Sequence, residues 1–343
     1  MYIKEYWYIA ARIKELQARP LSKTLLSEPL VLFRQGDGSA VALIDRCAHR
    51  NMALSSGQVR DGCVQCPYHG WRYGKDGQCA EIPSLGPGAS IPQSTRVRAY
   101  PTSESDGFIW VYMGSQLPKT SPPRFPYYQE PRWTSFSMKT RFPANALACL
   151  ENFLDCPHTT YVHQGWFRSS EAKKVRAKVR YGKESVEVEF FDERDAKSVV
   201  SRLLFPSNEK MTHTDKFLMP TTSRVDYIFN PARHFIITSQ CTPISDDETE
   251  VYTVITFRFG RIAPLIRLFF EPLSRRIIRQ DVDILRAQSE QLRRFSGPQF
   301  TFVDTDLVAP HIWRLWKAAE TVEHGDAASA IAAKEDKEIV LQF

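Results

Sequence analysis

The 343-residue chain lacks the features that mark several large classes of protein. No apolar run reaches membrane-spanning length, and the most apolar late stretch, residues 262–270, is short and contains Arg267. It has no long basic run and no base-stacking motif, so we expect no nucleic-acid partner. The first residues do not resemble a signal peptide, and the seven cysteines lack the spacing of a secreted disulfide scaffold. We therefore expect a cytoplasmic protein without an integral membrane segment.

Two redox patterns are also missing. The chain has neither a GxGxxG dinucleotide-binding motif nor the cysteine spacing of a plant-type ferredoxin. A nicotinamide or flavin reaction would therefore need a separate protein. What the chain does have is enough length for two domains and many aromatic residues, 21 Phe, 13 Tyr and 7 Trp, which suits packed β-structure and an apolar pocket.

The most informative residues form two short pairs. Cys47-Ala-His49 is followed, after sixteen residues, by Cys66-Pro-Tyr-His69. Two sulfide-bridged irons need four terminal ligands, and in a Rieske centre two histidines replace two cysteines on one iron. The pairs therefore predict a Rieske [2Fe–2S] cluster with two cysteine and two histidine ligands. The alternative is a structural zinc or redox disulfide using Cys63-x-x-Cys66, which leaves the Cys-x-His pair unexplained.

A second group of donors follows further along the chain. Asp155, His158 and His163 lie within nine residues, and two imidazoles with one carboxylate can form the facial triad of mononuclear Fe(II) oxygenases. Asp155 and His158 are three apart and would share a helix face. The two histidines are five apart, roughly 140° on an ideal helix, so the helix has to end or kink between them to serve one metal. Pro157 favours such a distortion because it disfavours helical geometry at the preceding residue.

Together these motifs resemble the oxygenase component, or α subunit, of Rieske non-haem iron oxygenases. Both motifs occur in that family's order, about ninety residues apart, and the resemblance covers roughly residues 5–295. The segments 6–10 and 68–73 resemble the monooxygenase or demethylase-like branch. The resemblance implies a Rieske cluster held by the two pairs, and a mononuclear Fe(II) that binds His158 and His163.

The resemblance also implies a third iron ligand on a late helix, where Asp281 and Asp283 compete. Asp281 lies on the same helical stripe as Leu285, Gln288 and Leu292, and the leucines predict that this stripe is buried. The stripe that contains Asp283 is polar and is predicted to face solvent. A buried carboxylate is unfavourable unless it is paired or metal-bound, so we choose Asp281.

In this family the aspartate equivalent to Asp155 bridges the Rieske histidine of one subunit to an iron-binding histidine of the next, within a ring of three. The resemblance therefore implies a catalytic bridging role for Asp155, from His69 or His49 to His158, and a homotrimer. An ordinary acid at a helix N-terminus is the alternative.

The implied activity is hydroxylation, or oxidative demethylation, of a small and cyclic organic substrate with O₂. Electrons would come from a separate reductase or ferredoxin, with NAD(P)H and flavin used only by that partner. The alternatives are an arene cis-dihydroxylating dioxygenase, a Rieske electron carrier without oxygenation, and a zinc-stabilised binding protein. No motif fixes the pocket walls, although His213, Asn230 and His234 lie in the strands expected to form them.

The expected fold class is α+β. Residues 1–117 alternate short strands with turns and predict an all-β Rieske domain, followed by a Pro-rich linker at 118–131. Residues 132–325 predict a catalytic domain in which an antiparallel sheet covers iron-binding helices, and residues 326–343 an Ala-rich, charged tail. Within the catalytic domain we expect helices at 145–162 and 270–294. Strands are expected near 173–192, 197–205, 224–240 and 249–260.

Overall fold

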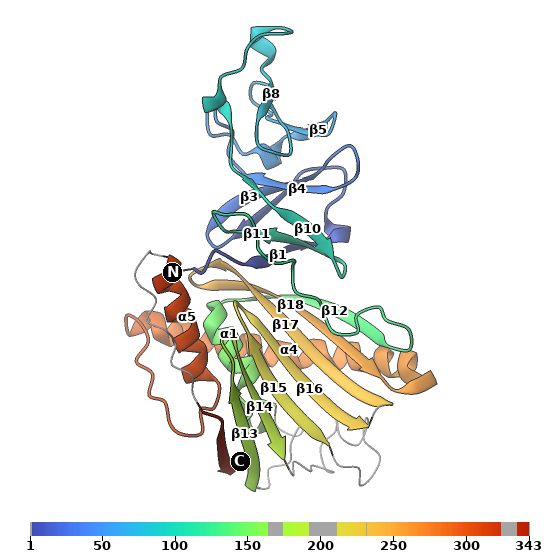
Figure 1. The fold of residues 1–343 in the computed structure, drawn as a ribbon, viewed down its shortest axis with the longest axis vertical. Coiled ribbons are helices and arrows are strands. Elements are labelled where there is room, and N and C mark those ends of the chain that lie inside the picture. The colour runs from blue at the N-terminus through green and yellow to red at the C-terminus, as the bar shows by residue number, and fades with distance from the viewer. Residues whose placement is uncertain (1, 164–173, 192–210, 231, 324–334, 343) are drawn as a thin grey trace. The chain divides into compact units, whose positions relative to one another are not determined.

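The computed structural model describes residues 2–163, 174–191, 211–230, 232–323 and 335–342 (Figure 1). The chain divides into two compact units, Tyr2–Arg124 and Phe125–Phe343. The division falls inside the Pro-rich segment 118–131.

The N-terminal unit is built from small antiparallel sheets. One has the order β1-β11-β10, with β1 (Trp7–Arg12), β11 (Phe108–Tyr112) and β10 (Thr102–Ser105). A second has the order β2-β3-β4-β9, with β2 (Leu21–Leu25), β3 (Glu28–Arg34), β4 (Ala40–Ile44) and β9 (Ala99–Tyr100). The third has the order β5-β6-β7-β8, with β5 (Gln58–Arg60), β6 (Cys63–Gln65), β7 (Arg72–Tyr73) and β8 (Cys79–Glu81).

The middle sheet of this unit separates two hydrophobic cores. Strand β3 carries an uninterrupted apolar run because both of its faces are buried. Leu30 and Leu32 point into a core shared with β1 and β11, whereas Val31 and Phe33 point into a second core. That second core also contains Cys47 and Cys66, so the two predicted thiolate ligands lie in packed protein.

The C-terminal unit is organised around one antiparallel sheet with the order β12-β18-β17-β16-β15-β14-β13-β19. Its strands are β12 (Thr134–Phe142), β13 (Lys174–Tyr181), β14 (Ser185–Phe191), β15 (Thr212–Leu218), β16 (Thr222–Asn230), β17 (Arg233–Ser245), β18 (Glu248–Arg258) and β19 (Lys337–Gln342). Strands β13, β14 and β15 alternate buried and less buried residues, as expected when one face meets a core.

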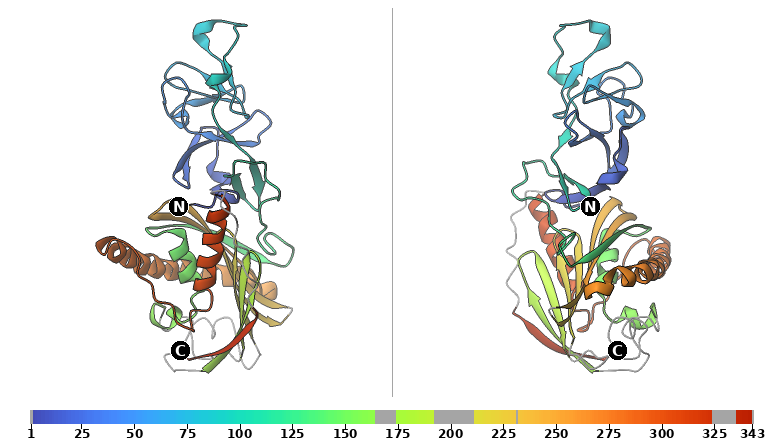
Figure 2. Two further views of the ribbon diagram at one scale, coloured as in Figure 1. Left: turned by 60° about the vertical axis from the view of Figure 1, so that its left-hand side comes forward. Right: turned by 90° about the vertical axis from the view of Figure 1, so that its right-hand side faces the viewer.

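Helices cover one face of this sheet. They are α1 (Ala146–Leu154), the short α2 (His158–Tyr161), the long α4 (Ala263–Arg294) and α5 (Ala309–Glu323). Both views of Figure 2 place green α1 between the sheet and orange α4. Asn145 caps α1, since its side chain accepts a hydrogen bond of 2.8 Å from the backbone N–H of Ala148. None of the described helices is both long and apolar enough to cross a membrane.

The predicted α+β architecture is confirmed, while several element boundaries were wrong. The helix expected at 145–162 is two helices, because residues 155–157 leave the helical path. The strands expected at 173–192 and 224–240 are each a hairpin of two strands. The strand expected at 197–205 lies outside the described residues. Strands β12, β15 and β19 and helix α5 were not predicted, and β19 lies within the segment expected to be a tail.

Candidate metal centres

The four cluster candidates lie on two loops that share one backbone turn. In the first loop, the N–H of Cys47 donates to the carbonyl of Met52, and Asn51 donates back to Cys47. In the second loop, the N–H of Cys66 donates to the carbonyl of Trp71, and the N–H of Gly70 donates to the carbonyl of Cys66. Asn51 and Gly70 occupy the same place in their turns, and both have positive φ, 57° and 75°. Asparagine and glycine tolerate this conformation, which explains why these residues stand four positions after each cysteine.

This turn brings the donor side chains of the two loops together. Cys47 and Cys66 are buried in the same hydrophobic core, where burial and the neighbouring Cys47 thiol raise the pKa of the Cys66 thiol. The rings of His49 and His69 meet edge to face with centroids 4.5 Å apart. His49 is partly buried and His69 is exposed, so the thiols face the core and the imidazoles face the surface of the chain. The structure therefore groups all four predicted residues at one place.

Neighbouring aromatic side chains fix these donors in position. Trp71 stacks on His49 with parallel rings 4.7 Å apart. The hydroxyl of Tyr73 lies 3.2 Å from Cys47 Sγ and accepts a hydrogen bond from the backbone N–H of Ala48 at 3.1 Å. Burial and the neighbouring thiol of Cys47 raise the pKa of Tyr73, so it stays a neutral donor toward the sulfur.

The chemistry of this donor set fits a Rieske cluster. His49 Nδ1 is buried and has no hydrogen-bond partner among the described residues, which is unfavourable unless the atom binds something else. Burial raises the pKa of the Cys66 thiol, while backbone N–H groups of Tyr68 and His69 directed at its sulfur oppose the rise. Burial makes the free thiolate of Cys66 unfavourable, whereas a bound metal and the surrounding N–H donors would both stabilise it. This environment is therefore typical of a metal-bound thiolate.

The second candidate centre forms where α1 and α2 meet α4. Helix α1 ends at Leu154, its capping residue Asp155 has extended backbone angles, and α2 begins at His158. His163 follows the end of α2, and Asp281 lies on the buried face of α4. The predicted break between the histidines is present. The prediction that Asp155 and His158 share a helix face was wrong, because Asp155 follows the last residue of α1 and His158 is the first residue of α2.

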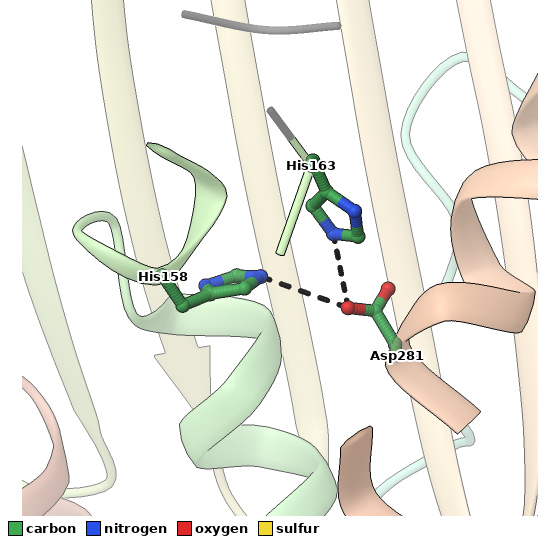
Figure 3. A group of neighbouring side chains, drawn as sticks. All are labelled: His158, His163 and Asp281. Carbon is green, nitrogen blue, oxygen red and sulfur yellow. Dashed lines mark ion pairs between the residues drawn. The ribbon is translucent and has the colours of Figure 1, made fainter. Parts of the chain in front are cut away.

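The three side chains point at one another (Figure 3). Their ligand atoms all lie within 4.8 Å of one another. Asp281 Oδ1 is 3.0 Å from His163 Nε2 and 3.6 Å from His158 Nε2. The predicted burial of Asp281 is confirmed, since its side chain is 9 % exposed, whereas that of Asp283 is 71 % exposed.

Hydrogen bonds on the far side of each imidazole select the nitrogen that faces Asp281. His163 Nδ1 donates to Gln280 Oε1 at 3.0 Å, and His158 Nδ1 donates to the backbone carbonyl of Asp155. Both Nε2 atoms are thereby directed inward, which is the usual arrangement for metal-binding histidines. Sequence reasoning did not identify the role of Gln280, because its contact joins residues 117 positions apart.

The electrostatics of this site favour a bound cation. Burial tends to raise the pKa of Asp281, but the two imidazoles outweigh it and hold the pKa below its ordinary value of 3.8. Burial opposes a charged His158, yet Asp281 and Asp155 outweigh burial and raise its pKa above 6.5. An ionised carboxylate between two imidazoles is a donor set that suits Fe(II).

Asp155 itself is solvent-exposed in this chain, at the C-terminal end of α1. The protein crowded around its carboxylate nevertheless raises its pKa above 3.8, an effect that the nearby His158 partly offsets. Asp155 and His158 are among the residues that line a cavity of about 710 Å³. Phe190 and Leu341 from the sheet, and Leu285 from α4, also line it.

The remaining polar candidates separate by face of the sheet. His213 is buried on the face that the helices cover. His234 belongs to the opposite face, where its Nε2 lies 3.0 Å from Asp226 Oδ1. Asn230 accepts the N–H of Ala232 at the end of β16 and so stabilises a turn. Only His213 therefore stays a candidate for the substrate side.

Comparison with known families decides between the cluster and zinc interpretations. Residues 6–101 match the Rieske [2Fe-2S] domain. Residues 142–319, slightly more than half of the chain, match the vanillate O-demethylase oxygenase C-terminal domain. The chain belongs to the Rieske oxygenase family. In this Rieske oxygenase the two matched ranges contain both donor groups, and the zinc interpretation of Cys63 and Cys66 was wrong.

Individual relatives support the same assignment. The dicamba O-demethylase oxygenase component of Stenotrophomonas maltophilia is 34% identical over 183 residues, 53% of this chain and 53% of its own. The 3-chlorobenzoate-3,4-dioxygenase oxygenase subunit of Comamonas testosteroni is 34% identical over 171 residues, 49% of this chain and 40% of its own. The Rieske oxygenase described here thus spans about half the length of the curated relatives it matches.

Solved structures extend the likeness of fold over nearly the whole chain. Dicamba monooxygenase bound to 3,6-dichlorosalicylic acid superimposes with a TM-score of 0.83, covering 94% of this chain and 99% of that one. The identity is 23%, so this likeness establishes the fold alone.

Proposed function

We propose that this chain is the oxygenase component of a two-centre enzyme that hydroxylates, or oxidatively demethylates, a small cyclic organic substrate with O₂. The observation that carries the proposal is the presence, in one chain, of two donor groups of different chemistry. One is a Cys₂His₂ group on twin loops, and the other is a His₂Asp group on helices beneath a sheet. An electron carrier needs only the first group.

In this proposal Cys47, His49, Cys66 and His69 hold a [2Fe–2S] cluster that transfers single electrons. Tyr73 and the backbone N–H groups near Cys66 hydrogen-bond the sulfurs and thereby set the reduction potential. The electrons come from a separate reductase or ferredoxin that uses NAD(P)H and flavin. Support for a separate donor is the lack of a GxGxxG motif in this sequence.

His158, His163 and Asp281 hold the second metal, and Fe(II) bound by such a triad keeps positions for O₂ and substrate. Gln280 and the carbonyl of Asp155 fix the tautomers of the two imidazoles, so that each presents Nε2 to the metal. The low pKa of Asp281 keeps its carboxylate ionised as a ligand. Burial of His163 and Asp281, whose side chains are 3% and 9% exposed, limits the access of water to this site.

We further propose that the enzyme works as a homotrimer in which Asp155 bridges the two centres between neighbouring subunits. Two observations support this role. The residue Asp155 is exposed although its carboxylate has protein around it and lies near His158, and the residue His69 is also exposed. A carboxylate that accepts an N–H from each of two histidines gives both centres a common hydrogen-bonded link.

Arene cis-dihydroxylation is the second candidate, because one curated relative is named as the oxygenase subunit of a dioxygenase. Product analysis separates the two. We would supply NADH and a surrogate ferredoxin–reductase pair, then screen methoxyarenes and methylarenes for substrate-dependent O₂ uptake. Formaldehyde or an alcohol carrying one atom from ¹⁸O₂ supports the proposal. A cis-diol carrying two such atoms supports dioxygenation, and a cluster that is reduced without any product in iron-loaded protein supports an electron carrier.

A further inference from the structure

Strand β15 carries a buried acid–base pair that neither metal centre uses. His213 and Asp215 are two residues apart, their side chains are 3% and 4% exposed, and His213 Nε2 lies 3.0 Å from Asp215 Oδ1. Phe217, the next alternate residue, packs in the core that contains α1. Because alternate residues of a strand share a face, His213 and Asp215 also point to the helix side of the sheet.

The imidazole of His213 belongs to a row of rings across this face. Phe190 and Tyr227 are its cross-strand partners on β14 and β16, and their rings stack on either side of it with centroids 4.8 Å and 4.4 Å away. Phe235 continues the row on β17. Phe190 also lines the 710 Å³ cavity that His158 lines. The row is thus a stack of rings whose first member, Phe190, reaches this cavity.

The carboxylate of Asp215 has few polar neighbours among the described residues. Its cross-strand partners are Val188 and Val225, and its one hydrogen bond within the described ranges is that to His213. An ionised carboxylate has about four acceptor sites, and a buried one is stable only when they are used. Among the residues that the structure describes, Asp215 is therefore a buried acceptor with capacity for another donor.

Asp215 also lies on the side of the sheet where the metal site forms. Helix α1, which ends at Leu154, packs against β15 as well as β16 and β17. The pair thus lies on the face of the sheet that α1 covers.

We propose that Asp215, positioned by His213, determines the substrate class of this oxygenase by accepting a hydrogen bond from the substrate. The substrate is then a neutral or cationic aromatic compound that carries an O–H or N–H donor, with its ring against the aromatic row. An aromatic carboxylate is rejected, because it would place a second acceptor against Asp215. The inference rests on the proposed function and adds the substrate class to it.

Binding of ring-matched probes tests this directly. We would measure dissociation constants by anaerobic equilibrium dialysis of the iron-loaded protein, without reductant, against 4-methoxyphenol, 4-methoxyaniline and 4-methoxybenzoate. The expected result is binding of the phenol or the aniline at least about tenfold tighter than the benzoate, the usual effect of one hydrogen bond to a charged group. Equal or tighter binding of the benzoate, or no saturable binding of either donor probe, overturns the inference.

Two variants isolate the acceptor. Asp215→Asn keeps the shape and an oxygen for His213, but turns an amide N–H₂ toward the substrate, so we expect the preference to fall about tenfold or to invert. His213→Gln keeps a donor to Asp215 and should preserve the preference while weakening binding of every probe. Asp247→Asn, in an exposed turn, is the matched control and should change nothing. An unchanged preference in folded Asp215→Asn protein contradicts the inference.

Failure of this inference can be told apart from failure of the proposed function. If the protein shows no Rieske signal or binds no iron, the proposed function is refuted, whatever the dissociation constants of the probes are. Protein with both centres filled, but with no preference for donor probes, fails only the role of Asp215. Circular dichroism and metal content of each variant identify those that have lost their fold.

Discussion

Gln280 offers a sharp test of the proposed iron site, because it touches no metal in our account. Its Oε1 accepts the Nδ1–H of His163 at 3.0 Å, and the histidine side chain is only 3% exposed, so water cannot easily replace the amide. Loss of such a partner of a metal-binding histidine typically lowers metal affinity about 10–100-fold, or about 1.4–2.7 kcal/mol. We therefore expect Gln280→Leu to weaken Fe(II) binding by that factor.

The assay is an anaerobic competition titration of Fe(II) against a chelator of known affinity. Gln280→Glu should retain wild-type affinity or exceed it, since a carboxylate accepts the same N–H more strongly. Gln291→Leu, an exposed position on the same helix, controls for the general effect of the substitution. Unchanged Fe(II) affinity in Gln280→Leu would refute the argument that this hydrogen bond orients a metal ligand.

Four other outcomes are expected. Asp281→Ala should lose its mononuclear iron while Asp283→Ala keeps it, as iron analysis per chain would reveal, because only the first carboxylate faces the two histidines. Asp155→Ala should leave both centres filled by EPR and metal analysis but abolish coupled O₂ uptake; normal turnover would remove the bridging role. Because the pKa of His158 is raised above 6.5 and iron needs its neutral form, Fe(II) affinity in chelator titrations should already be falling before the pH is lowered to 6.5, and should continue to fall below it. Tyr73→Phe should lower the cluster's reduction potential by about 40–60 mV in redox-monitored EPR, the equivalent of one hydrogen bond to sulfur; an unchanged potential would contradict that contact.

The cluster loops could be predicted from sequence because their chemistry is local. Each cysteine and histidine pair lies in one turn, and Asn51 and Gly70 mark the position where that turn needs a positive φ. Asp281 could be separated from Asp283 for a similar reason, since helical periodicity alone distinguishes a buried stripe from an exposed one. Their burial agrees with that prediction.

Other features depend on contacts between distant parts of the chain, which periodicity does not report. The hydrogen bond from His163 to Gln280 joins the turn after α2 to helix α4. Strand β19 pairs with β13 across more than 150 residues of sequence. Asp215 gave a signal that was missed, because alternate residues 213, 215 and 217 of β15 place an imidazole, a carboxylate and a phenyl ring on one face. The helix break at Asp155 was anticipated from Pro157, but its consequence for the position of Asp155 was not.

The oxygenase assignment requires that one chain hold both a Rieske cluster and a mononuclear iron. EPR of the anaerobically reduced protein treated with nitric oxide detects both centres in one sample. We expect a reduced Rieske signal together with a high-spin Fe–NO signal, and loss of only the second signal in Asp281→Ala. A Rieske signal without any Fe–NO species in iron-replete protein would contradict the oxygenase assignment and favour an electron carrier.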